Sequence, residues 1–159
     1  MRRSGVLSSS APPIRPSTGE STMTGTLFEW NDSFLIGIEE LDHEHKVLID
    51  DINKLHEELI GNEKKSELTK CLGEIYVHMQ AHFALEEHVM KKHEYEFFDE
   101  HKREHEEFLE SFTECMMQFL NGAEISSKNP IEECLKQWVV DHITTSDKKM
   151  ALMVQAKVA

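Results

Sequence analysis

Apolar residues return at alternating steps of three and four positions in four stretches of the chain, which is the spacing of a helix that turns one face towards a core. Three stretches span about residues 42–60, 66–92 and 98–120, and the fourth opens at Asn129 and Pro130. Short connections between helices of similar length predict an all-α protein, an up-down-up-down four-helix bundle. The inward positions are Leu48, Ile49, Ile52, Leu55 and Leu59, then Leu68, Leu72, Ile75 and Met79, then Phe108, Phe112, Cys115 or Met116 and Phe119, and finally Ile131, Leu135 and Trp138.

Capping and helix-breaking residues mark the ends of these stretches. Asp42 is expected to cap the first helix, and Gly61 with Asn62 to end it. Asn129 is expected to cap the fourth helix, with Pro130 at its first position.

The chain before the first helix lacks a helical period. Residues 26–38 carry apolar anchors without that period and are expected to form a non-helical arm packed against the bundle. Residues 1–22 are rich in Arg, Ser and Pro and are expected to be a disordered extension. Their composition suits an organelle transit peptide, and a vector-derived or mis-called start before Met23 is an equal alternative. The bundle domain is therefore expected at residues 23–159.

Charge and cysteine content narrow the function classes. The 159 residues carry a formal net charge of −13 at pH 7, spread along the helices, which repels nucleic acid and anionic membranes. No stretch approaches the roughly 20 apolar residues that span a bilayer. Three cysteines without Cys-x-x-Cys spacing indicate reduced thiols. We expect a soluble, monomeric, cytoplasmic protein with no nucleic-acid or membrane partner, or an organellar one if residues 1–22 are a transit peptide.

Histidines and carboxylates stand where the apolar stripes would place a core residue. In the second helix the steps of three and four continue to His82 and Glu86. In the third, His101 and His105 form an i, i+4 pair in phase with the phenylalanines. The complete set of such positions is His45, His82, Glu86, His101, His105, His142 and Asp147.

Asp147 fits an ideal α-helix poorly. It follows His142 by five positions, which at about 100° per residue places it roughly 140° away around the helix. It therefore needs a long reach or a loosened helix end to join the others.

Taken together, these residues predict a metal site. A single buried histidine or carboxylate is more often an ordinary hydrogen-bonded group, but seven from four helices are costly unless they are paired or bound to metal. Five imidazoles and two carboxylates without a thiolate are too many for one tetrahedral zinc. They suit two five- or six-coordinate iron ions bridged by carboxylate, that is, a di-iron site.

The same segments resemble the haemerythrin family, most closely the single-domain bacteriohaemerythrins. The likeness covers about residues 27–152, and its only departures are Glu96, where Pro is usual, and Val139, where Leu is common. It rests on residues 41–48 (LDHEHKVL), 82–87 (HFALEE), 101–108 (HKREHEEF) and 138–143 (WVVDHI), with Asp147.

The resemblance implies reversible binding of dioxygen at two iron ions (Fe2+/Fe3+) joined by an oxo or hydroxo bridge. The second iron would keep an open position for dioxygen. Each iron would have its own imidazoles, and two carboxylates would bridge the pair: His101, His105 and His142 on one iron, His45 and His82 on the other, Glu86 and Asp147 between them. The implied oxygen pocket consists of Leu48, Phe83, Trp138 and Val139.

Two functions are compatible with such a site. One is reversible dioxygen binding by a carrier, store or sensor, and the alternative is a di-iron enzyme acting on peroxide, nitric oxide or ferrous iron. An imidazole-rich site with one open position, shielded by apolar side chains, favours binding without turnover. The role and any oxygen-consuming partner stay open. The other histidines are expected on outward faces. His78, one turn before His82, is nevertheless a candidate to hold the His82 side chain in place through an outer contact.

Overall fold

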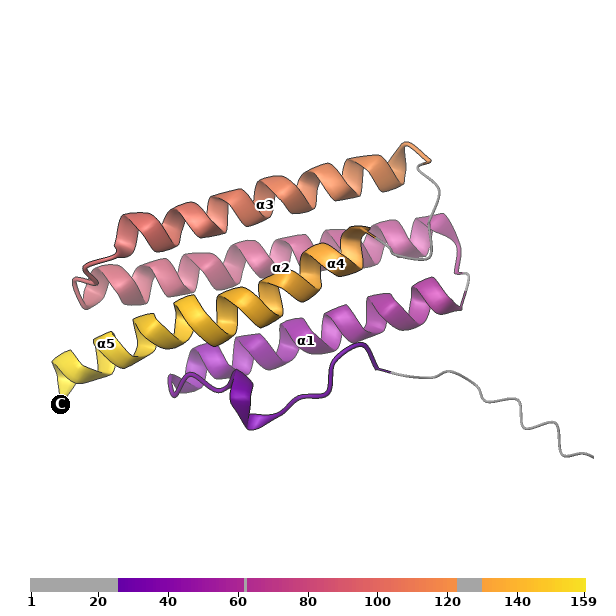
Figure 1. Ribbon diagram of the computed structural model, residues 1–159. Coiled ribbons are helices and arrows are strands. Elements are labelled where there is room, and N and C mark those ends of the chain that lie inside the picture. Colours follow the sequence, from indigo (N-terminus) through magenta and orange to yellow (C-terminus); the bar gives the residue numbers. More distant parts are fainter. Residues whose placement is uncertain (1–25, 62, 123–129) are drawn as a thin grey trace, which may run out of the picture.

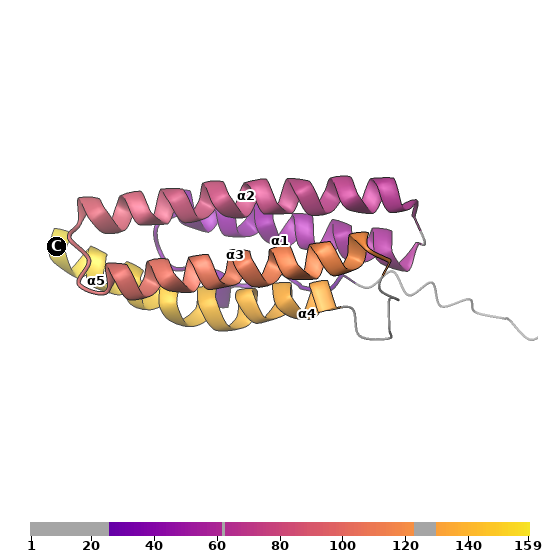
Figure 2. The ribbon, with the colours of Figure 1, turned by 90° about the horizontal axis from the view of Figure 1, so that it is seen from above.

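Four long helices run alternately up and down in the computed structural model, which describes residues 26–61, 63–122 and 130–159. They are α1 (Glu39–Ile60), α2 (Lys65–Lys92), α3 (Phe98–Leu120) and a fourth helix composed of α4 (Pro130–Gln137), η2 (Trp138–Asp147) and α5 (Lys148–Val158). Figures 1 and 2 show that consecutive helices lie side by side and that the fourth returns along α1 and α3. The predicted all-α, up-down-up-down bundle is confirmed.

Helix ends match the sequence prediction closely for α2 and α3 but not for α1. The cap predicted at Asp42 is wrong, because α1 begins at Glu39 and Asp42 lies within its first turn. Gly61 ends α1 as predicted and donates its N–H to the Glu57 carbonyl at 2.9 Å. The predicted roles of Asn62 and Asn129, and the expected extension at residues 1–22, lie outside the described residues.

The Asp42 carboxylate instead holds the N-terminal arm. Its oxygens accept the backbone N–H groups of Ile36 at 2.7 Å and Gly37 at 3.0 Å. Gly37 adopts a φ of +88°, a conformation that favours glycine, and its carbonyl accepts a 2.8 Å hydrogen bond from the Gln155 side chain on α5. The arm thus bridges α1 and α5.

A second anchor fixes the start of the arm to α1. The Asn53 side chain accepts from the Phe28 N–H at 2.8 Å and donates to the Phe28 carbonyl at 2.9 Å. Phe34, in the short 3-10 turn η1 (Asp32–Phe34), is buried against the core together with Ile36. The arm packs on the bundle as predicted, but η1 gives it one helical turn.

The core follows the apolar stripes, with one helix less buried than expected. All predicted core positions of α2 are buried, whereas on α3 only Phe112 is fully buried among the predicted apolar residues. Phe108, Cys115, Met116 and Phe119 pack against the core while partly exposed. Within the described ranges, no helix is long and apolar enough to cross a membrane.

The fourth helix changes its winding in the middle. Residues Trp138–Asp147 form a π-helix, in which each N–H bonds five residues back, so residues five apart lie one above the other. The hydroxyls of Thr144 and Thr145 bond to the carbonyls of Val140 and Asp141, four residues back. These carbonyls are the ones that α-helical N–H groups would use, which weakens the α-helical alternative here.

We expect Asp42→Ala to destabilise the protein by about 2 kcal/mol, because two backbone donors lose a charged acceptor. Urea unfolding followed by circular dichroism measures the change. The matched control is Asp50→Ala, at an exposed position of the same helix, which should change stability by no more than about 0.5 kcal/mol. Equal effects of both substitutions would show that Asp42 does not hold the arm.

Candidate metal centre

The seven ligand-type residues predicted from the sequence meet in the middle of the bundle. Each is at most 8% exposed, and four of them are completely buried. Their side-chain nitrogen and oxygen atoms form two groups, within each of which the atoms lie no more than 4.8 Å apart. One group is Glu86, His101, His105, His142 and Asp147, and the other is His45, His82, Glu86 and Asp147.

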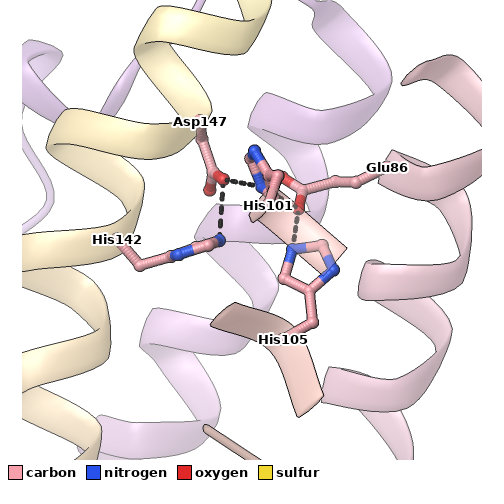
Figure 3. A group of neighbouring side chains, drawn as sticks. All are labelled: Glu86, His101, His105, His142 and Asp147. Carbon is pink, nitrogen blue, oxygen red and sulfur yellow. Dashed lines mark ion pairs between the residues drawn. The ribbon is translucent and has the colours of Figure 1, made fainter. Parts of the chain in front are cut away.

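Glu86 and Asp147 belong to both groups because each turns one oxygen towards either side. Oε1 of Glu86 lies 3.3 Å from Nε2 of His82, and Oε2 lies 2.9 Å from Nε2 of His105. Oδ2 of Asp147 lies 3.2 Å from Nε2 of His45, and Oδ1 lies 3.1 Å from that of His101. Figure 3 shows the two carboxylates side by side, with the imidazoles of the first group converging on them.

The π-helix resolves the awkward position of Asp147. Because residues five apart are stacked in this winding, Asp147 faces the same side as His142, and its Oδ1 lies 2.9 Å from Nε2 of His142. The loosened helix that the five-residue spacing required is therefore built into the fourth helix.

The converging atoms fit a cation. Nε2 of all five histidines and all four carboxylate oxygens are buried, and within the described part of the chain they make no hydrogen bond of normal geometry. Buried polar groups without partners are rare and costly. These atoms are all acceptors when the imidazoles are neutral, so metal ions satisfy them where further protein groups do not. The three cysteines belong to neither group.

Mutual proximity shifts the pKa values of three of the imidazoles and of both carboxylates. Burial opposes the charged imidazolium, but Asp147 and Glu86 outweigh it and raise the pKa of both His45 and His101 to about 9. For His142 the carboxylates of Asp147, Glu104 and Glu86 raise the pKa to about 10 against the same penalty. Burial likewise opposes ionisation of the two central carboxylates, yet the surrounding imidazoles hold their pKa values well below the usual range.

Two carboxylates that the sequence reasoning missed support the three-histidine group. Nδ1 of His142 donates to Glu104 at 2.9 Å, and Nδ1 of His105 donates to Glu87 at 3.3 Å. The His142 contact lowers the pKa of Glu104 to about 2. Such bonds fix the tautomer in which Nε2 carries the free lone pair. The only sequence signal was adjacency, since Glu104 precedes His105 and Glu87 follows Glu86.

The two-histidine group has apolar and aromatic surroundings instead. Nδ1 of His45 and Nδ1 of His82 have no hydrogen-bond partner among the described residues. The Trp138 ring lies 6.3 Å from the His45 ring and 6.0 Å from the His82 ring. Nδ1 of His105 and Nδ1 of His142 thus have carboxylate partners, whereas Nδ1 of His45 and Nδ1 of His82 do not.

The four predicted pocket residues are all buried, and the aromatic ones contact the histidines of the centre. Phe83 stacks on His105 with ring centroids 4.0 Å apart, and it lies 6.2 Å from Trp138. Leu48 and Val139 are completely buried, on α1 and in η2.

The remaining histidines lie away from the centre. The idea that His78 supports His82 is wrong, because its ring faces outwards and pairs with Asp51 at 2.5 Å. His56 is half-buried and joins α1 to α4 through a 2.7 Å contact with Glu132.

Comparisons with known proteins agree with this geometry. Residues 36–154 match the family model described as "Hemerythrin HHE cation binding domain". The chain is 31% identical to a "Bacteriohemerythrin" of Stenotrophomonas maltophilia, over 82% of this chain and 83% of that protein. It is 30% identical to a "Myohemerythrin" of Theromyzon tessulatum, over 77% and 89%. A crystal structure of a hemerythrin mutant superposes with a TM-score of 0.72 at 26% identity, covering 82% of this chain and 98% of that one.

We expect Glu104→Gln to weaken metal binding about 10- to 100-fold, because His142 loses the anionic acceptor that orients its ring and increases its basicity. Competition with a chelator measures the affinity. Glu107→Gln, at an exposed position on the same face of α3, is the control and should bind like the unaltered protein. Unchanged affinity in Glu104→Gln would mean that the bond is only structural.

Metal uptake at pH 7 should release protons. Before metal binds, the raised pKa values of His45, His101 and His142 keep these imidazoles protonated at neutral pH, whereas metal binds the neutral form. The release should shrink as the pH rises through about 9 to 10. Anaerobic titration with ferrous iron in weak buffer, with a pH indicator, measures it. Binding without proton release at pH 7 would contradict the charge arrangement described here.

Proposed function

Because this chain belongs to the haemerythrin family, we propose that it binds dioxygen reversibly at a pair of iron ions in the centre of the bundle. Its relatives are named as haemerythrins, and the centre offers groups of buried donors suited to metal. Glu86, Asp147 and the five histidines would hold the iron pair, which would supply the reversible electron transfer that dioxygen binding needs. The protein's own part is to hold two ions at a fixed separation and to leave room for one small ligand.

One observation carries the proposal: both central carboxylates are shared between two groups of imidazoles. Glu86 and Asp147 each turn one oxygen to the His45 side and the other to the His101 side. A carboxylate used in this way bridges two ions, whereas a single ion would leave half of its oxygens unsatisfied. Five imidazoles with hard oxygen ligands and no thiolate suit iron in a five- or six-coordinate geometry.

The two groups contain different numbers of histidines, which favours binding of a ligand at only one of the two ions. We propose that His101, His105 and His142 hold one iron and that His45 and His82 hold the other. With the two shared carboxylates, the first iron would have five protein donors and the second would have four. One bridging oxo or hydroxo group would complete the first iron at six ligands and leave the second one position short.

The side chains around the open position would favour dioxygen over larger or charged molecules. We assign the pocket to Leu48, Phe83, Trp138 and Val139, which are all at most 3% exposed. Apolar walls exclude water and anions, while a small neutral diatomic molecule pays little desolvation cost on entry.

Metal analysis with optical spectra tests the proposal. After expression with iron we expect two irons per chain and visible bands in air, which bleach when oxygen is removed and return when it is readmitted. His101→Ala should abolish stoichiometric iron because three contacts to the two carboxylates and the metal are lost together. His88→Ala, at an exposed position of α2, is the control and should retain iron and bands.

Two other outcomes would overturn the proposal. One zinc per chain, or iron that is lost without effect on the bundle, would rule out the di-iron centre. Two irons with bands that decay during continuous consumption of oxygen, peroxide or nitric oxide would indicate the alternative, a di-iron enzyme, at the same site.

A further inference from the structure

Two thiols face each other between α3 and α4. Cys115 on α3 and Cys134 on α4 are both half-buried and are hydrogen-bond partners of one another. Sγ of Cys115 also lies 3.9 Å from the carbonyl oxygen of Pro130, one helical turn before Cys134. The two cysteines lie on directly packed helices and line the same groove, so their thiols are placed to react with one another.

We propose that Cys115 and Cys134 form a redox-active pair that hydrogen peroxide converts into an intramolecular disulfide joining α3 to α4. This inference concerns the thiols alone and does not depend on what the metal centre binds. It assigns the pair a chemical role that reduced core cysteines would not have.

The two thiols have different roles in the reaction. Burial raises the pKa of both, for Cys134 to about 12, but the hydrogen bond from Cys134 partly offsets the rise at Cys115. Cys115 therefore provides more thiolate, which is the attacking form. Cys134, which donates that hydrogen bond, is placed to attack the oxidised sulfur in turn.

The steps balance with peroxide as the only oxidant. The Cys115 thiolate attacks one peroxide oxygen, the S–O bond forms, the O–O bond breaks, and hydroxide leaves and takes up a proton to become water. The Cys134 sulfur then attacks the Cys115 sulfur, the S–S bond forms, and the S–O bond breaks with release of a second water. Two thiols lose two electrons and two hydrogens, and one peroxide becomes two waters.

The position of the pair determines which oxidants reach it. Both cysteines line a groove of about 610 Å³ between α3 and the fourth helix, which extends to Trp138 and His142. Glu107 and Asp141 are exposed in the same groove and repel anions. Neutral hydrogen peroxide is not repelled, so a small uncharged oxidant moving along this groove meets the thiols.

The third cysteine provides an internal comparison. Cys71 on α2 is only 4% exposed, and burial together with the nearby Glu58 raises its pKa to about 12. It lacks the thiol neighbour that Cys115 has. Oxidation should therefore distinguish the pair from Cys71.

Peroxide treatment of the metal-loaded full-length protein, followed by alkylation in denaturant and peptide mapping, tests the proposal. We expect loss of two of the three thiols, one Cys115–Cys134 disulfide within a chain, an alkylated Cys71, and full recovery with dithiothreitol. The oxidised form should also melt at a higher temperature, because the disulfide closes a loop in the unfolded chain.

Variants separate the pair from general oxidation. Cys71→Ser should form the same disulfide at the same rate. Cys134→Ser should form none, and its Cys115 sulfenic acid should be trapped by dimedone; Cys115→Ser repeats the test should Cys134→Ser fail to fold. Reduced Cys115 and Cys134 after treatment, oxidation of Cys71 as fast as the pair, cross-links only between chains, or a disulfide seen only after the metal is lost would each overturn the proposal.

Discussion

Two carboxylates buried in the centre of the bundle determine how all four helices must sit. Glu86 and Asp147 come from α2 and the fourth helix, and their oxygens face imidazoles from α1, α3, α2 itself and the fourth helix. A buried carboxylate is tolerated only when its charge is compensated on every side. Sliding or rotating any one helix would leave at least one of these oxygens without an imidazole beside it. The carboxylates therefore help to fix the register of the helices, which the apolar stripes alone do not fix.

The centre is also asymmetric in what stands behind its imidazoles. On one side, Glu87 and Glu104 accept from His105 and His142, so negative charge reaches the metal position through the rings. On the other side, His45 and His82 are backed by apolar and aromatic groups. Outer carboxylates strengthen a histidine as a ligand, whereas a dry apolar shell lowers the local dielectric constant. The bundle thus places two chemically different positions side by side.

Both the fold and the candidate site could be predicted from the sequence because both follow helical periodicity. His82, Glu86, His101 and His105 lie in phase with core residues, so their burial could be read from spacing alone. The cap at Asp42 was misassigned because the arm that uses its carboxylate has no periodic pattern. Glu104 and Glu87 were missed because each bonds to a histidine on another helix, and the spacing of residues within one helix carries no information about such contacts. The pairing of Cys115 with Cys134 was missed for the same reason.

The π-helical winding of residues Trp138–Asp147 links the metal centre to the far end of the chain. Relative to an α-helix, such a segment accommodates an additional residue, and removal of one residue there would turn everything beyond it by about 100°. The Gln155 side chain that holds Gly37, and the Lys157 amine that reaches the His93 carbonyl at 3.0 Å, would then point elsewhere. The π-helical segment therefore changes the rotational phase of the fourth helix. The helix makes inner contacts before this segment and outer contacts after it, and a continuous α-helix would not satisfy both sets.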